Sequence, residues 1–175
     1  MKNLKIWSLA LALLVSFTGC QSEEGDGADK KAPFNPIATA QIAEKIVGAW
    51  EITEYAGQPA EFDVYIEFQA DGAYELYQRV FNHEYEKLAG TYELLEAELS
   101  GVYTFTTVDE SDRTTVTNVD WNNVYTVKIA EKPLRLRLVE SNGAYAEYQA
   151  VESVPAYVKE QAVEVEATRA SEYFL

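Results

Sequence analysis

Cysteine and histidine are almost absent from this sequence, which has one of each in 175 residues, Cys20 and His83. One cysteine leaves no partner for a disulfide within the chain, and one histidine without a second thiol or imidazole does not make the usual ligand set of a transition metal. No Ser/His/Asp arrangement or glycine-rich phosphate loop occurs in the context that its chemistry requires. We therefore expect no metal, no cofactor and no enzymatic activity.

Positive charge is also scarce. The chain carries 14 Lys and Arg against 29 Asp and Glu, a formal net charge of −15. A surface of this sign repels phosphates and anionic lipid headgroups, so nucleic acid is excluded as a partner.

Long apolar runs are missing as well. The longest, residues 6–17, is shorter than the about 20 residues that a helix needs to cross a bilayer. It follows Lys2 and Lys5 and precedes Thr18-Gly19-Cys20, a pattern typical of a secretory signal with small residues before the cut.

This N-terminus resembles a bacterial lipoprotein signal, in which signal peptidase II cuts before a cysteine that carries lipid; Phe17 departs from the Leu that is more usual there. The resemblance predicts that residues 1–19 are a removed signal peptide and that Cys20 is acylated, with palmitate for example. The acyl chains would anchor the protein in the outer membrane without a membrane-spanning segment.

Residues 20–33 are expected to form a flexible tether, because residues 21–32 contain no aromatic or branched apolar side chain to bury. Gln21-Ser22-Glu23-Glu24 resembles the acidic signals that send some lipoproteins to the outer face of the outer membrane. An ordinary solvated linker explains the same residues, so a cell-envelope location is expected and the choice between the periplasmic and outer faces stays open.

Residues 34–175 are predicted to be one domain with a single core. Apolar spacing predicts a short helix over residues 39–47 with Thr39 as N-cap, and Gly48 ends it. From there to Val151 the apolar period is two, and turn-like clusters separate the runs. The pattern predicts an all-β fold of about eight to nine short strands, either a barrel or a sandwich. Strands are expected at residues 50–55, 64–68, 74–80, 90–95, 101–108, 113–119, 124–130, 134–140 and 144–151.

The last segment changes character after Pro155. Residues 156–170 are rich in Ala, Glu and Val at helical spacing, which predicts a C-terminal helix. Alternation over residues 163–166 makes a final strand the alternative.

Gly48-Ala49-Trp50 at the start of the first strand resembles the opening of the lipocalins and of lipocalin-like domains in bacterial lipoproteins, and the looser resemblance extends over residues 46–150. The resemblance implies a single antiparallel up-and-down β-barrel of about eight strands. It also implies that Trp50 closes one end of this barrel and that a late-strand arginine, Arg135 or Arg137, stacks on its indole ring. The cysteine pair of many secreted lipocalins is missing, so the resemblance concerns the fold and leaves the ligand open.

Alternation places a bulky, largely aromatic set inside the barrel, which either lines a cup for one small apolar ligand or fills it. The candidate ligand-binding residues are Phe68, Tyr74, Leu76, Tyr103, Phe105 and Tyr125. The leading hypothesis is a carrier of a small hydrophobic or amphipathic molecule. The alternative is a packed surface module that binds a protein or glycan, for which the outward tyrosines Tyr65, Tyr77 and Tyr85 would be sugar platforms. The oligomeric state stays open.

Overall fold

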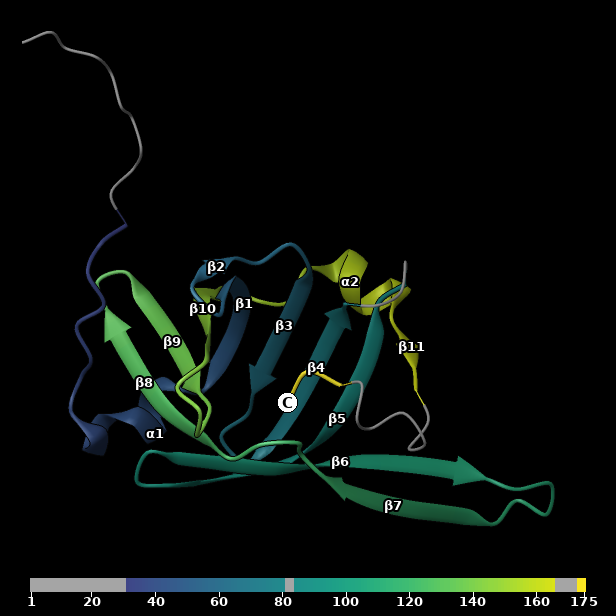
Figure 1. Ribbon diagram of the computed structural model, residues 1–175. Helices are drawn as coiled ribbons and strands as arrows, with labels where there is room; N and C mark the ends of the chain where they lie inside the picture. Colours follow the sequence, from purple (N-terminus) through teal and green to yellow (C-terminus); the bar gives the residue numbers. More distant parts are fainter. Residues whose placement is uncertain (1–30, 81–83, 166–172) are drawn as a thin grey trace, which may run out of the picture. The chain divides into compact units, whose positions relative to one another are not determined.

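The computed structural model of the protein is predominantly β-sheet and describes residues 31–80, 84–165 and 173–175. Its strands are β1 (Gly48–Tyr55), β2 (Gln58–Pro59), β3 (Asp63–Phe68), β4 (Ala73–Arg79), β5 (Glu86–Leu95), β6 (Glu98–Val108), β7 (Thr114–Asp120), β8 (Tyr125–Glu131), β9 (Leu134–Val139), β10 (Tyr145–Val151) and β11 (Val163–Glu164). Eight of them form a closed ring in the order β1, β3, β4, β5, β6, β8, β9 and β10, each antiparallel to its neighbours (Figure 1). The predicted all-β fold with about eight main strands is confirmed.

The β3–β4 hairpin illustrates how the sequence builds this ring. Ile66 pairs with Leu76 and Phe68 pairs with Tyr74, so that the alternating apolar residues of both strands face the same side. Gly72 adopts a φ of 87°, which an L side chain rarely tolerates, and closes the predicted turn between the strands. The inward residues of this hairpin are almost completely buried.

A short helical segment precedes β1. It consists of the 3-10 turn η1 (Thr39–Gln41) and the single turn α1 (Ile42–Lys45). The predicted N-cap role of Thr39 is wrong, because Thr39 is the first residue of the turn and the preceding Ala38 makes no side-chain cap. Ile42 and Ile46 are buried, and the indole Nε1 of Trp50 donates to the carbonyl oxygen of Ile46 at 2.7 Å. The hydrogen bond of Trp50 thus links the helical segment to the start of β1.

A second, smaller core lies on the outer face of the ring, under α2 (Ala156–Gln161). Tyr65, Tyr77 and Tyr85 pack there with Val158 of α2, and each has a relative exposure of 5% or less. The expectation that these tyrosines are exposed sugar platforms is therefore wrong. The helix covers them because its apolar face needs a partner, which the outward rings provide.

The predicted C-terminal helix is shorter than expected. It ends at Gln161, and Val163–Glu164 forms β11, which pairs in parallel with β5. The strand alternative is therefore confirmed for these two residues. Residues 166–170 of the predicted helix lie outside the described residues.

Strands β6 and β7 extend beyond the ring. The pairing of β5 with β6 runs from Leu95 and Glu98 as far as Gly90 and Tyr103. Beyond Tyr103, β6 continues to Val108 paired only with β7, and this ribbon diverges from β5 (Figure 1). A gap therefore opens between the first residues of β5 and the last residues of β6.

The described residues from Ala32 to Leu175 belong to one compact unit. Within the described ranges, no helix has the length and apolarity that a membrane crossing would require. The predicted signal peptide, Cys20 and most of the predicted tether lie outside the described residues, as does His83.

Candidate functional site: the interior of the ring

All six side chains predicted to line a ligand cup are buried in one hydrophobic cluster. They come from β3, β4, β6 and β8, and their relative exposures range from 0% to 7%. The six residues are Phe68, Tyr74, Leu76, Tyr103, Phe105 and Tyr125. The structure brings them together as the inward face of the ring.

The same cluster contains the end of the chain. Tyr173 and Leu175 have relative exposures of 3% and 0%, and Phe174 packs against the cluster. We call residues 173–175 the tail segment. In Figure 1 the C mark lies at the centre of the molecule, in front of β4. No local pattern in the sequence predicts a position inside the ring for these three residues.

The tail segment is held by hydrogen bonds to its main chain. The Tyr103 hydroxyl donates to the Leu175 carbonyl oxygen at 2.5 Å and accepts from the Leu175 N–H at 3.0 Å. The side-chain oxygen of Gln78 accepts from the Phe174 N–H at 2.9 Å. Two side chains therefore make three hydrogen bonds to the main chain of the last two residues.

A second set of contacts comes from the segment before β8 and from its first residue. Asn122 donates its main-chain N–H to the Leu175 carbonyl oxygen at 3.1 Å and its side-chain N–H to the Tyr173 carbonyl oxygen at 3.0 Å. The Tyr125 hydroxyl donates to the Phe174 carbonyl oxygen at 3.4 Å. We call Gln78, Tyr103, Asn122 and Tyr125 the interior site.

Aromatic contacts hold the side chains of the tail segment. The Tyr173 ring lies 5.4 Å from Tyr103 and 6.1 Å from Phe105, measured between ring centroids. Phe174 lies 5.6 Å from both Tyr55 and Phe62, at the end of the ring where β1 ends and β3 begins. Such tilted and edge-to-face arrangements are the favoured ones for aromatic pairs.

Gln78 and Glu86 are polar residues at inward positions that the sequence analysis missed. They are paired across β4 and β5, their exposures are 0% and 3%, and the Gln78 side-chain N–H donates to the Glu86 carboxylate at 3.1 Å. The signal that would have found Gln78 is strict alternation, because it follows Tyr74 and Leu76 at the same spacing. Gln78 lies within the strand predicted over residues 74–80, but a polar side chain gives no apolar signal of burial.

Tyr148 of β10 adds a further hydroxyl to the interior. It is fully buried, and its hydroxyl has no hydrogen-bond partner among the described residues. Burial raises its pKa well above the ordinary value, and the neighbouring hydroxyls of Tyr125, Tyr103 and Tyr55 raise it further. Burial likewise raises the pKa of Tyr125 to about 12. These hydroxyls are therefore neutral hydrogen-bonding groups at physiological pH.

Arg135 and Arg137 do not stack on Trp50, so this expectation is wrong. Gln149 pairs with both Glu51 and Arg135, which places Arg135 on the face of the sheet opposite to Trp50. Both guanidinium groups instead lie over the ring of Phe34, at 5.2 and 4.1 Å from its centroid.

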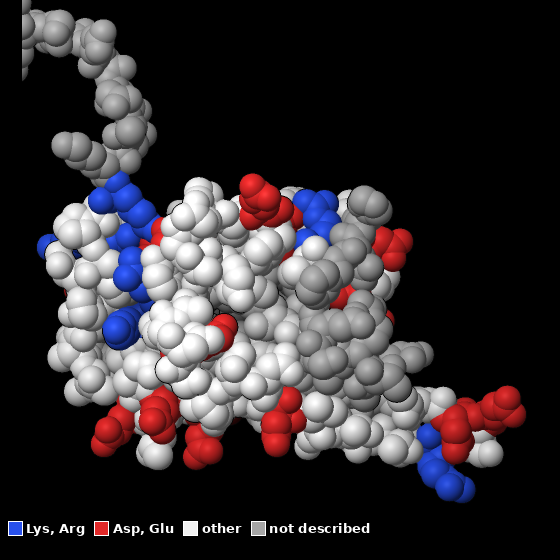
Figure 2. Space-filling view, viewed as in Figure 1, with Lys and Arg blue, Asp and Glu red and all other residues white. Residues whose placement is uncertain are grey.

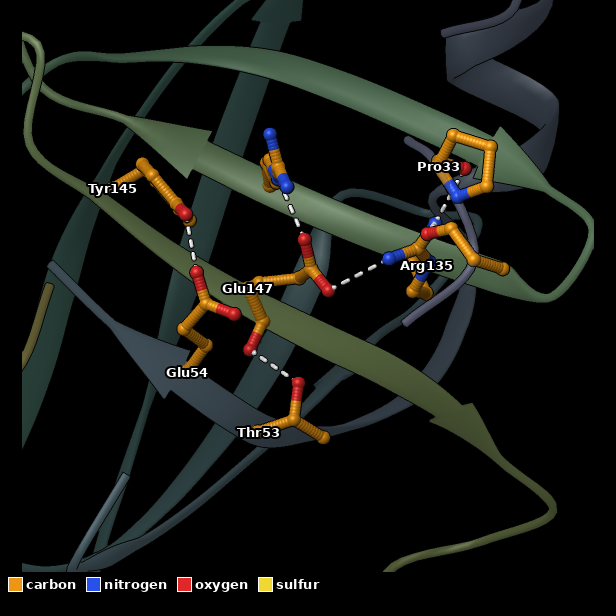
Figure 3. A network of polar contacts seen from close by, with 8 residues as sticks. Pro33, Thr53, Glu54, Arg135, Tyr145 and Glu147 are labelled. Carbon is orange, nitrogen blue, oxygen red and sulfur yellow. Dashed lines mark hydrogen bonds and ion pairs between the residues drawn. The ribbon is translucent and has the colours of Figure 1, made fainter. Parts of the chain in front are cut away.

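A buried carboxylate holds both arginines on this outer face (Figure 3). Glu147 has a relative exposure of 0%, and its two oxygens accept from Arg135 at 3.1 Å and from Arg137 at 2.6 Å. Arg135 also donates to the carbonyl oxygens of Ala32 and Pro33, at 2.8 Å each. The network ties the N-terminal segment to β9 and β10 and has a structural role.

A hollow of about 260 Å³ lies in the gap between β5 and β6. Its lining includes Leu88 and Phe105, which also belong to the interior cluster, and Val165, which follows β11. The volume is just below the ~300 Å³ at which ordinary ligand pockets begin. With the tail segment in place, a small molecule in the hollow would contact only the edge of the interior, at Leu88 and Phe105.

Within residues 31–80, 84–165 and 173–175, no group of three or more His, Cys, Asp or Glu side chains could hold a metal ion. The interior offers apolar rings, hydroxyl and amide groups and the buried Glu86 carboxylate. Comparisons with protein-family models, with curated proteins and with solved structures found no match for this chain.

Proposed function

We propose that the chain is a lipid-anchored protein of the cell envelope whose lipocalin-like barrel binds a small hydrophobic or amphipathic ligand. One observation carries the ligand: the interior already accommodates aromatic rings, an aliphatic side chain and peptide groups, all of them from the tail segment. A largely apolar interior with a few placed polar groups is the usual chemistry of small-molecule sites.

The lipocalin-like assignment is supported by the ring of eight strands and by the position of Gly48-Ala49-Trp50. Trp50 is buried at the start of β1 and bonded to the segment before it, which suits a residue that closes one end of a barrel. The arginine position departs from the family pattern, because Phe34 takes the place of the indole ring.

Ligand binding is tested by native mass spectrometry of protein purified from its own host. We expect one small molecule per chain. The variant Ala89→Trp narrows the hollow between β5 and β6 and should lose the adduct, whereas the matched variant Val116→Trp, on the exposed ribbon, should keep it. Repeated preparations of the unaltered chain without any adduct would contradict the proposal.

The anchor is tested separately by metabolic labelling with a palmitate analogue. The variant Cys20→Ala should lose the label and leave the membrane fraction or stay unprocessed, and Ser22→Ala in the same segment should behave like the unaltered chain. Normal processing and membrane retention of Cys20→Ala would show that the anchor is not a lipid on this cysteine.

A packed interaction module remains the second candidate, favoured by the β6–β7 ribbon. Most of this ribbon beyond the ring is exposed, with Val108 at 63% and Val116 at 59%, and acidic side chains gather at its tip (Figure 2). Open strand edges and exposed β-branched residues suit addition of a partner strand. Replacing residues 107–115, which do not line the hollow, by a short turn should abolish partner capture if this function holds and should leave ligand binding unchanged if the first one does.

A further inference from the structure

We infer that the tail segment is an exchangeable occupant of the interior, and that the site takes a short extended peptide with aromatic and aliphatic side chains. This inference rests on the proposed function, because it assumes that the interior is a ligand site. It adds the chemical class of the ligand and names what occupies the site in its absence.

The contacts themselves point to a peptide. The hydrogen bonds between the interior site and the tail segment all engage main-chain N–H groups and main-chain oxygens of the tail segment. Main-chain recognition of this kind does not depend on sequence, and specificity then comes from the spaces for the side chains. Those spaces hold two aromatic rings and one leucine, with Leu175 completely buried.

Tyr148 supplies a second and independent observation. Its buried hydroxyl has no partner among the described residues, and Tyr148 belongs to the same buried cluster as Tyr103 and Tyr125. Buried hydroxyls are normally paired. A ligand with one more acceptor oxygen would make a hydrogen bond that the tail segment does not make.

The hollow between β5 and β6 gives an occupant a way to the interior. Leu88 and Phe105 line both the hollow and the interior cluster, and β11 runs along the same stretch of β5. A peptide entering here would meet the space now filled by Tyr173, whose ring contacts Phe105.

A tethered occupant competes strongly. A segment joined to its own site acts at an effective concentration of about millimolar. A free ligand can bind only those chains whose site the tail segment has left, so its apparent affinity for the intact chain is reduced in proportion to that fraction. We therefore expect peptide binding to become tighter when the tail segment is removed.

The test compares the full chain with a variant that lacks residues 173–175. The probe is a fluorescently labelled peptide Ser-Glu-Tyr-Phe-Leu, which repeats residues 171–175, and the control peptide is Ser-Glu-Ala-Ala-Ala. The truncated chain should bind the first peptide with one-to-one stoichiometry and at least about tenfold more tightly than the full chain does. Tyr103→Phe in the truncated chain should weaken binding, because two hydrogen bonds to the peptide are lost.

Equal binding to both chains, or no binding to a folded truncated chain, would overturn the inference. If the truncated chain does not fold, the full-length variant Leu175→Ala replaces it, and an unchanged peptide affinity would then count against exchange. Lauric acid serves as a second probe. A truncated chain that binds lauric acid but not the peptide would sink the inference and leave the proposed ligand function standing, whereas one that binds neither would contradict both.

Discussion

At the scale of single residues, two buried tyrosines of the interior differ in what their hydroxyls do. Tyr103 donates to and accepts from Leu175, whereas the hydroxyl of Tyr148 has no partner among the described residues. An unpaired buried hydroxyl costs free energy, while a paired one contributes about 0.5–1.5 kcal/mol. The same side chain therefore has opposite effects on stability at these two positions.

We expect Tyr148→Phe to leave the free energy of unfolding at pH 7 unchanged or to raise it by up to about 1 kcal/mol, and Tyr103→Phe to lower it by about 1–3 kcal/mol. Urea denaturation of both variants and the unaltered chain measures the difference. A substantial loss of stability in Tyr148→Phe would mean that its hydroxyl does have a partner.

The pH dependence of stability follows from the raised pKa of Tyr148. Because the pKa is higher in the folded chain than in the unfolded chain, the folded state holds the proton more tightly. The resulting stability is complete below pH about 10 and is lost as the pH rises further. In Tyr148→Phe, the slope of unfolding free energy against pH above 10 should be smaller by up to about 1.4 kcal/mol per pH unit. Identical slopes above pH 10 would contradict a buried, neutral Tyr148.

Glu147 gives the sharpest prediction for the outer face. Its replacement by Gln leaves Arg135, with a side-chain exposure of 5%, without its buried counter-charge. Loss of one partner of a buried ion pair typically costs about 3–5 kcal/mol. The control Glu67→Gln breaks the more exposed pair with Lys159 and should cost at most about 1 kcal/mol. Thermal unfolding of both variants makes the comparison, and similar losses would argue against a special role of Glu147.

At the scale of elements, the strands could be predicted and their limits could not. Alternation located every ring strand, but β5 begins at Glu86 and β6 at Glu98, each before the predicted start. The missed residues include the inward Glu86, whose burial depends on Gln78 of the neighbouring strand. A polar residue that is buried through a partner elsewhere in the chain gives no local apolar signal.

The crossing of β5 and β6 depends on Gly90, which lies where the two strands separate. A Cβ atom at this position would lie 1.8 Å from the Val102 carbonyl oxygen, a distance that no side chain can accept. We expect Gly90→Ala to push the strands apart and to lower the free energy of unfolding by more than about 2 kcal/mol. Ala89→Ser at the adjacent position is the control. Hydrogen exchange of the β5 and β6 amides would locate the damage, and unchanged protection there would contradict this account.

At the scale of the whole molecule, the interior is completed by a segment far from it in sequence. Local patterns identified the ring residues but not their occupant, because Tyr173, Phe174 and Leu175 are apolar enough to be buried but carry no signal of where in the fold they lie. The wrong prediction that Arg135 or Arg137 stacks on Trp50 has the same cause. Which ring an arginine meets depends on the path of the N-terminal segment, and Phe34 gives no signal of that path.

Leu175→Ala tests whether the tail segment is part of the core. Truncating a completely buried leucine should lower the free energy of unfolding by about 2–5 kcal/mol, and Val163→Ala, at a half-exposed position, should change it by less than about 0.5 kcal/mol. Chemical denaturation of both variants measures the two changes in the free energy of unfolding. Equal effects of the two substitutions would show that the tail segment contributes no more than a surface residue.

The two hydrogen bonds from Arg135 to the carbonyl oxygens of Ala32 and Pro33 also determine how the folded unit would carry a mechanical load. Under the proposed anchoring at Cys20, any pull from the membrane enters the folded unit at these residues. The load would pass through a planar guanidinium group and Glu147 into β9 and β10 before it reaches the short bridge between Pro36 and Ala130. The buried ion pair would then distribute tension on the tether over two ring strands. Without it, the first residues of the folded unit would detach one after another.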